Sequence, residues 1–371
     1  SFRTLYGRPL LCRLMRKVEL RELGIAIGKF PTGIYNAITD VPGVLVGHTT
    51  ICSDVPFVRR TGVTIVMPRY GDIWANHAFA GMHVLNGNAE VSGSLWLEET
   101  GRMCTPIALT NTYSIGIVRD TLALYARNHE FADDCVLPLM FETSEDWLSD
   151  VKPNDIEYTD VINALASAAG GMVAEGNVGG GTSGICYDFK GGIGTASRLV
   201  SIENTQYTIG VLVQTNYGDR ELLTINGISV GRKITSVQVP SGWDEPPRGG
   251  SVVVIIATDA PLLPLQCKKL AHRAELGLAL VGCIGSYSSG DVVITFSTGN
   301  NLRIASSSIL NLKVLTDVSL DGLFYGVIEA VREAVLNSLT AATTMVGFKG
   351  RTAFELPLDD LKQVILKYNK D

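Results

Sequence analysis

The sequence has few features that would assign it to a common functional class. Its seven cysteines are scattered through 371 residues without a Cys-x-x-Cys pair, which argues against a zinc site or a disulfide framework and favours reduced thiols in the cytoplasm. The net charge is −6, and no basic stretch is interleaved with aromatic residues, so nucleic acid is not an expected partner. Apolar runs are far shorter than the roughly 18 residues of a membrane-spanning helix. We therefore expect a soluble protein that acts on small molecules or peptides.

Motifs for metal, nucleotide and conventional triad chemistry are also missing. Among five histidines, His77 and His83 lie six residues apart, which fits neither one helix face nor a zinc motif. The glycine-rich segment 175–198 lacks the lysine of a phosphate-binding loop, so it is interpreted as a series of tight turns against a sheet. Because no Gly-x-Ser-x-Gly elbow is present, a Ser-His-acid triad has little support. We expect no metal and no cofactor.

Short β-rich runs alternate with helical stretches along the chain. β-branched runs bounded by turn residues predict strands, several of them apolar on both faces and hence buried between layers. Apolar spacing predicts helices, with Asp259 as N-cap of the second and Pro261 and Pro264 in its first turn. No linker divides the chain, so one α/β domain with stacked sheets and outer helices is expected. The predicted strands are 62–68, 207–215, 251–258 and 291–298, and the predicted helices are 161–176, 261–280 and 320–342.

Ser251 stands at the junction of a Pro-Pro-Arg-Gly-Gly segment and a buried strand. If the Gly250–Ser251 bond were cut, Ser251 would gain an α-amine, with a pKa of about 7.7 to 8.0, beside its own hydroxyl. The nucleophile would then carry its own general base. Gly250 has no Cβ, so this peptide can adopt the strained geometry in which the hydroxyl attacks the preceding carbonyl. Taken alone, a Gly-Gly-Ser stretch before a strand is usually an ordinary loop.

Several long segments resemble, in order, the DmpA-type L-aminopeptidase/D-esterase family, which includes the β-peptidyl aminopeptidases. The resemblance implies a four-layer αββα sandwich of the type shared with the ornithine acetyltransferases. It also implies a precursor, 1–371, that cleaves itself into an α chain, 1–250, and a β chain, 251–371, and forms a homotetramer of these heterodimers. The similar segments are 20–50, 83–93, 175–198, 213–218, 248–264 and 288–300.

The same resemblance implies roles for individual residues. Ser251 matches the processing serine and N-terminal nucleophile. Ser289 and Asp291 match a serine and a carboxylate that orient the nucleophile and its amine, and Asn216 matches an amide that donates to the oxyanion. Considered without the resemblance, Ser-Gly-Asp and Asn-Tyr-Gly are ordinary turn sequences.

One segment, 141–150, matches the family pattern at one position and departs from it at another. Glu142 matches an acidic residue that receives the free ammonium of the substrate. Two residues later the family often has a tyrosine whose hydroxyl aids the oxyanion, whereas this chain has Ser144. Because a serine hydroxyl lies several Å closer to its backbone, turnover or substrate range should differ from the typical member.

The sequence therefore predicts a serine aminopeptidase that acts on small peptides, amino-acid amides and esters through an acyl-enzyme on Ser251. Two alternatives stay open. An acyltransferase of the ornithine acetyltransferase type would use threonine at this position, and an unprocessed pseudoenzyme would keep only the scaffold. The basic segment at the start of the chain is compatible with a trimmed or processed start or with a transit-peptide remnant.

Overall fold

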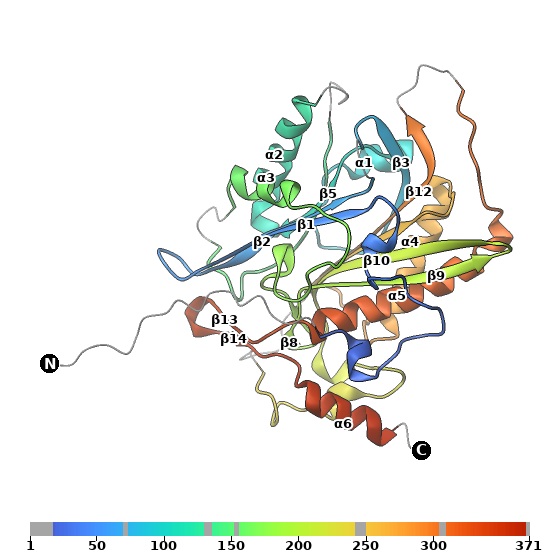
Figure 1. Cartoon of the computed structure of the whole chain (residues 1–371). Helices are drawn as coiled ribbons and strands as arrows, with labels where there is room; N and C mark the ends of the chain where they lie inside the picture. The colour runs from blue at the N-terminus through green and yellow to red at the C-terminus, as the bar shows by residue number, and fades with distance from the viewer. Residues whose placement is uncertain are drawn as a thin grey trace.

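Two β-sheets packed face to face form the centre of this computed structural model (Figure 1), which describes residues 18–69, 73–129, 136–151, 156–241, 250–303 and 309–368. Most of the basic N-terminal segment lies outside the described residues, as do Cys12, Cys135 and positions 246–249 before Ser251. Among the helices within these ranges, none is long and apolar enough to cross a bilayer.

The smaller sheet has four strands in the order β1-β2-β5-β6. Only β5 and β6 pair in parallel, and the other two pairings are antiparallel. The strand predicted at 62–68 corresponds to β2, whose inner residues are buried on both faces. The strands are β1 (Leu45–Ser53), β2 (Arg59–Met67), β5 (Ile107–Asn111) and β6 (Leu139–Thr143).

The larger sheet has six strands in the order β4-β3-β12-β11-β10-β9. β11 lies near its centre, parallel to β12 and antiparallel to β10. Its valines and isoleucines alternate between the core beneath the helices and the core between the sheets, which explains a run that is apolar on both faces. The strands predicted at 207–215, 251–258 and 291–298 are confirmed. The strands are β3 (Asn76–Gly87), β4 (Arg102–Met103), β9 (Ile193–Ile202), β10 (Thr205–Asn216), β11 (Gly250–Thr258) and β12 (Ser289–Arg303).

Helices cover the outer face of each sheet. Apolar side chains of α2 and α3 share a core with the smaller sheet, and those of α4 and α5 share one with the larger sheet; Figure 1 shows these two pairs on opposite sides of the strands. The predicted αββα sandwich is therefore confirmed. The helices are α1 (Ser94–Thr100), α2 (Ile115–Arg127), α3 (Tyr158–Ala166), α4 (Pro264–Ala279), α5 (Asp321–Thr340) and α6 (Leu358–Tyr368).

Two helix boundaries differ from the prediction. α3 ends at Ala166 instead of 176, because Ala169 pairs with Val46 of β1 and the chain then turns. Asp259 does not cap α4, because its carboxylate accepts the N–H of Thr208 at 2.7 Å. α4 begins at Pro264, which holds the preceding residue in an extended conformation, and Pro261 stays outside the helix.

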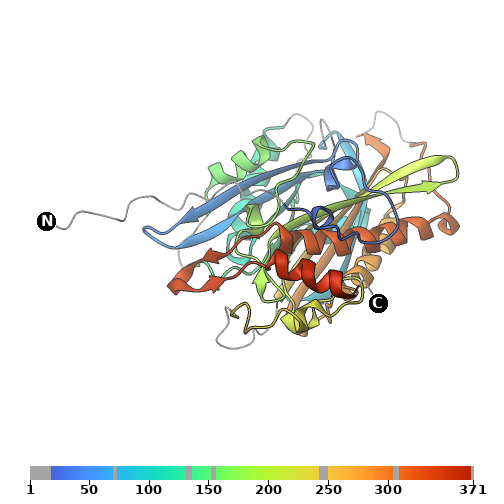
Figure 2. The same cartoon turned by 60° about the horizontal axis from the view of Figure 1, so that its bottom comes forward.

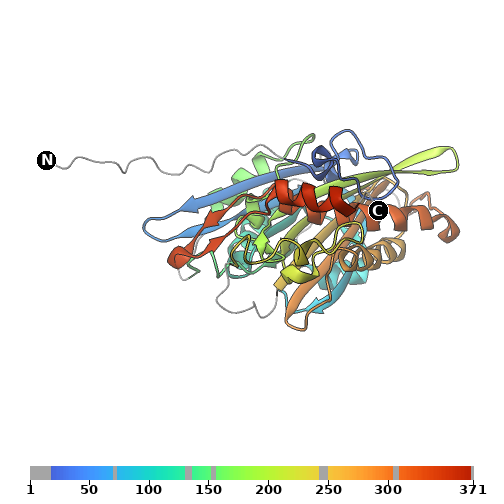
Figure 3. The same cartoon turned by 90° about the horizontal axis from the view of Figure 1, so that it is seen from below.

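A small hairpin from the C-terminal region lies beside the smaller sheet. Figures 1 and 3 show β13 and β14 next to the turn that joins β1 to β2, and Arg60 Nε donates to the Val346 carbonyl at 2.9 Å. Figure 2 shows the two C-terminal helices, α5 and α6, in red. The remaining strands are β7 (Ile185–Cys186), β8 (Phe189–Lys190), β13 (Met345–Val346) and β14 (Thr352–Ala353).

Candidate active site

Ser251 is the second residue of β11, where the register of the larger sheet gathers the predicted site. It lies opposite Asn216 of β10 and opposite Gly290 of β12, while Gly250 lies opposite Ser289. Ser251 is 4% exposed, and its Oγ has no hydrogen-bond partner in the described part of the chain. A buried hydroxyl is seldom left unpaired, so this atom is available for chemistry.

Gly250 is required by close packing. A Cβ at this position would lie 2.9 Å from the Asn216 carbonyl oxygen and 3.0 Å from Tyr217 Cα. Because glycine has no Cβ, the backbone at position 250 can lie this close to the end of β10.

Asp291 anchors a buried polar cluster beside Ser251. Its carboxylate accepts the Ser289 hydroxyl at 2.6 Å and the Asn86 amide at 2.8 Å. Burial raises the pKa of Asp291, and hydrogen bonds from Ser289, Asn86 and the Val252 N–H oppose that shift. Ser289 and Asp291 open β12 and do not form a turn. Sequence reasoning missed Asn86, although it lies in the similar segment 83–93.

The side-chain amide of Asn216 has a fixed orientation. Its Oδ1 accepts the backbone N–H of Ile185 at 3.1 Å, so the opposite end of the amide, Nδ2, is the donor. Nδ2 donates to no atom of the described residues, and Asn216 lines the cavity that also exposes Ser251. An oriented N–H donor beside a nucleophile is the arrangement that stabilises an oxyanion.

Glu142 is a buried carboxylate at the end of β6. It is 4% exposed, and it accepts the Glu90 backbone N–H at 3.0 Å and the Thr112 hydroxyl. Burial raises the pKa of Glu142, while these two hydrogen bonds lower it. An arriving ammonium group would offset the cost of keeping this charge buried. Thr112 and the Glu90 N–H were not foreseen, because neither carries a sequence signal.

At the position where the family often has a tyrosine, this chain has a short side chain whose hydroxyl already makes a hydrogen bond. Ser144 lies just beyond β6, and its Oγ donates to Asp146 Oδ1 at 2.9 Å. It is part of the cavity wall. Ser144 therefore faces the same space as Ser251 but directs its proton toward Asp146.

A cavity of about 720 Å³ connects these groups. Glu142, Ser144, Asn216, Gly250 and Ser251 line it together, whereas Ser289 lines a smaller neighbouring cavity. The structure thus brings every predicted site residue to one region. The other lining residues are Gly87, Asn88, Ala89, Glu90, Thr112, Tyr113, Asp146, Trp147, Ser288 and Arg351.

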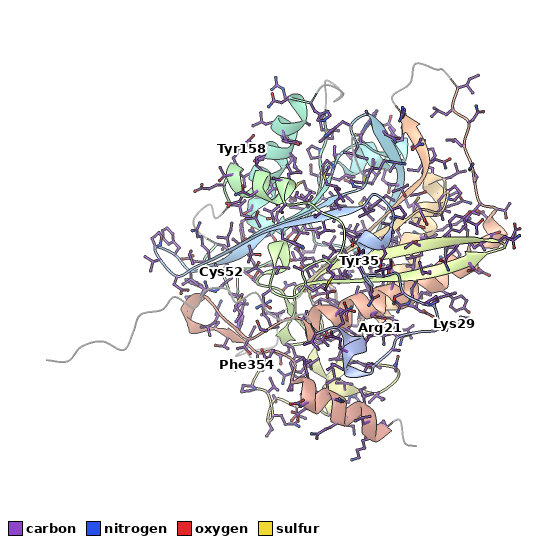
Figure 4. The ribbon with its side chains drawn as sticks, viewed as in Figure 1. Arg21, Lys29, Tyr35, Cys52, Tyr158 and Phe354 are labelled. Carbon is purple, nitrogen blue, oxygen red and sulfur yellow. The ribbon has the colours of Figure 1, made fainter. Side chains whose placement is uncertain are left out.

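Metal and thiol chemistry have little support in the part of the chain that the structure describes. It contains no group of three His, Cys, Asp or Glu side chains arranged to hold a metal ion. Cys186, Cys267 and Cys283 are free thiols, and Cys52, labelled in Figure 4, lies exposed near the end of β1. Burial raises the pKa of Cys283, which lines the smaller cavity, to about 11, so its thiol stays protonated at neutral pH.

Comparisons with known proteins find similar sequences and structures over most of the chain. The model described as Peptidase family S58 matches residues 36–353. The β-peptidyl aminopeptidase BapA of Sphingosinicella microcystinivorans is 37% identical over 367 residues, covering 94% of this chain and 92% of the relative. A Burkholderia sp. β-aminopeptidase superimposes with a TM-score of 0.89 at 42% identity, covering 94% of this chain and 99% of the other. A third similar structure is the L-aminopeptidase D-Ala-esterase/amidase from Ochrobactrum anthropi, described as a prototype of the serine aminopeptidases and a new variant of the Ntn hydrolase fold. It superimposes with a TM-score of 0.87 at 36% identity, covering 95% of this chain and 99% of the other.

Proposed function

The chain belongs to peptidase family S58, and we propose that it is an aminopeptidase whose precursor cleaves itself before Ser251. The observation that carries the proposal is the buried, unpaired Ser251 Oγ, which shares one cavity with Glu142 and Asn216. These three groups are the nucleophile, the ammonium receptor and the oxyanion donor that such an enzyme needs.

Self-cleavage is the first reaction in this proposal. Ser251 Oγ attacks the Gly250 carbonyl carbon, its proton passes to the Ser251 nitrogen, and the peptide bond becomes an ester. Water then hydrolyses the ester, leaving a carboxylate on Gly250 and a free α-amine on Ser251. Neighbouring Ser289 and Asp291 orient the serine and, after cleavage, its amine.

Hydrolysis of a substrate follows from the cleaved form. Glu142 binds the substrate ammonium, and the Ser251 α-amine takes the hydroxyl proton as Oγ attacks the scissile carbonyl. Asn216 Nδ2 donates to the oxyanion, a contribution of about 3 kcal/mol for one donor. The protonated α-amine then gives its proton to the leaving group, and water releases the acyl group from Ser251.

The substrates in this proposal are small peptides, amino-acid amides and esters with a free amine. β-Aminoacyl compounds are included, because relatives at 37% and 42% identity carry that activity in their names. We also propose a cytoplasmic homotetramer of cleaved heterodimers. Large apolar side chains at the surface, such as Ile34, 92% exposed, and Tyr287, 99% exposed, support association.

The two alternatives are not favoured. The acyltransferase alternative requires a threonine nucleophile, and this chain has Ser251. A pseudoenzyme would have no need for an oriented Asn216 amide or for the hydrogen bond between Ser289 and Asp291.

The test is release of p-nitroaniline from β-alanyl and L-alanyl p-nitroanilides. We expect the wild type to hydrolyse at least one of them, and the folded Ser251→Ala variant to hydrolyse neither. Turnover by Ser251→Ala would exclude Ser251 as the nucleophile, and an inactive wild type would contradict the proposal.

A further inference from the structure

The cavity wall contains one basic side chain that the proposed mechanism does not use. Of the lining residues, all of which the structure describes, Arg351 alone is basic. It accompanies the carboxylates of Glu90, Glu142 and Asp146 in the same wall. A cation in this wall is chemically suited to a negative group of a substrate.

The structure holds Arg351 in place from both its backbone and its side chain. Its carbonyl accepts the Gly347 N–H at 2.8 Å, which fixes it in the hairpin of β13 and β14. Its Nη1 donates to the Trp147 carbonyl at 3.2 Å, and its guanidinium carbon lies 5.6 Å from the centre of the Trp147 ring. Stacking on an indole favours a cation and restricts its motion.

Most of the guanidinium remains available. Among the ion pairs of the described residues, none includes Arg351, and the nearby Asp146 accepts the Ser144 hydroxyl instead. A guanidinium has five N–H donors, and only the bond to Trp147 occupies one of them here. The remaining donors suit two-point binding of a carboxylate.

We propose that Arg351 binds the C-terminal carboxylate of the substrate, so that the enzyme selects dipeptides and other very short peptides. This inference rests on the proposed function, in which Glu142 receives the ammonium and Ser251 attacks between the two ends. Among the contacts of the described residues, Glu142 and Arg351 form no ion pair and share no hydrogen-bond partner, so each charge is free for its own end of a zwitterion. A cavity of about 720 Å³ lies within the range, about 300–1,000 Å³, that encloses small ligands.

The experiment compares two substrates that differ only at the carboxyl end: β-alanyl-L-alanine and β-alanyl-L-alanine amide. We expect the wild type to prefer the free acid. In Arg351→Met, kcat/KM should fall on the order of tenfold or more for the acid and little for the amide. Arg351→Lys should keep part of the preference, because it retains the charge without the planar fork.

Asp146→Asn is the matched control, since it changes a charge in the same wall without removing the cation. It should leave the preference for the acid intact. An equal fall on both substrates in Arg351→Met would show a structural role and overturn the assignment. A wild type that hydrolyses both equally, or that hydrolyses an aminoacyl anilide but neither dipeptide, overturns only the role of Arg351. One that hydrolyses neither dipeptide and neither anilide overturns the proposed function as well.

Discussion

At the scale of single residues, the chemistry depends on which polar atoms already have partners. Glu142 accepts two hydrogen bonds and Asn216 accepts one, so their remaining capacity points to an ammonium and to an oxyanion. Ser251 Oγ has no partner among the described residues. The proposed roles rest on these differences between the three side chains rather than on their mere presence.

Glu142→Gln should separate substrate binding from self-cleavage. Removing the charge weakens binding of the substrate ammonium, and KM for an aminoacyl anilide should rise on the order of tenfold or more. Self-cleavage should be unchanged, because it involves no external amine. Steady-state kinetics and a denaturing gel measure the two effects. Glu90→Gln is the control, because it removes a charge from the same cavity wall but keeps the backbone N–H, and it should have the smaller effect on KM. Equal loss of self-cleavage and of substrate hydrolysis in Glu142→Gln would indicate a structural role.

Ser144→Tyr should raise kcat several-fold on an aminoacyl anilide. A tyrosine reaches farther into the cavity and can add a second donor to the oxyanion. Ser144→Phe is the control, because it adds the ring without the hydroxyl. An equal gain in both variants, or a gain in neither, would show that this chain completes its oxyanion site in another way.

The members of the candidate site were predictable where they lie in segments that resemble the family, and hidden where partners come from distant strands. Ser251, Ser289 and Asp291 lie in such segments, and the structure groups them. Asn86 binds Asp291 across 205 positions of sequence, and Arg351 reaches the cavity from a hairpin with no recognisable pattern. No local pattern gives such pairings, because they follow from sheet register.

At the scale of elements, three adjacent strands determine the site. β10, β11 and β12 end or begin at the same edge, so Asn216, Ser251 and Ser289 become neighbours through register alone. The strands were predictable from apolar runs bounded by turns. The cap of α4 was not, because the Asp259 carboxylate serves β10, a contact that only the packed sheet creates.

The smaller sheet contains a histidine that should make stability depend on pH. His48 of β1 lies opposite Thr64 of β2, whose hydroxyl accepts the Gly180 N–H at 3.1 Å and lies 2.9 Å from His48 Nδ1. Burial lowers the pKa of His48 to about 4 from its usual 6.5. Between these values the unfolded chain binds more protons, so the free energy of unfolding falls as the pH drops.

Between pH 7 and pH 5 this residue should lower the free energy of unfolding by about 2 kcal/mol. Urea unfolding at the two pH values measures the loss. In His48→Gln, which has no titrating group, the loss should be smaller by that amount. A variant with the same pH dependence as the wild type would assign the loss to other groups.

At the scale of the whole molecule, the two predicted chains are interleaved. β11 and β12, from 251–371, lie between β3 and β10, from 1–250. Arg21, labelled in Figure 4, joins the N-terminal region to Glu333 of α5 at 2.6 Å, and Arg198 of β9 donates to the same carboxylate at 2.6 Å. Cleavage before Ser251 should therefore leave one folded particle, because the core beneath α4 and α5 and the core between the sheets each contain residues of both chains.

The most direct measurement is amino-terminal sequencing of the purified wild type after prolonged incubation, with Ser251→Ala beside it. We predict a fragment that begins Ser-Val-Val-Val-Ile in the wild type, and a single uncut polypeptide in Ser251→Ala. The cleaved chains should stay together in native mass and separate on a denaturing gel. An uncut wild type that still hydrolyses aminoacyl substrates would contradict the account, because the α-amine of Ser251 could not then be the base.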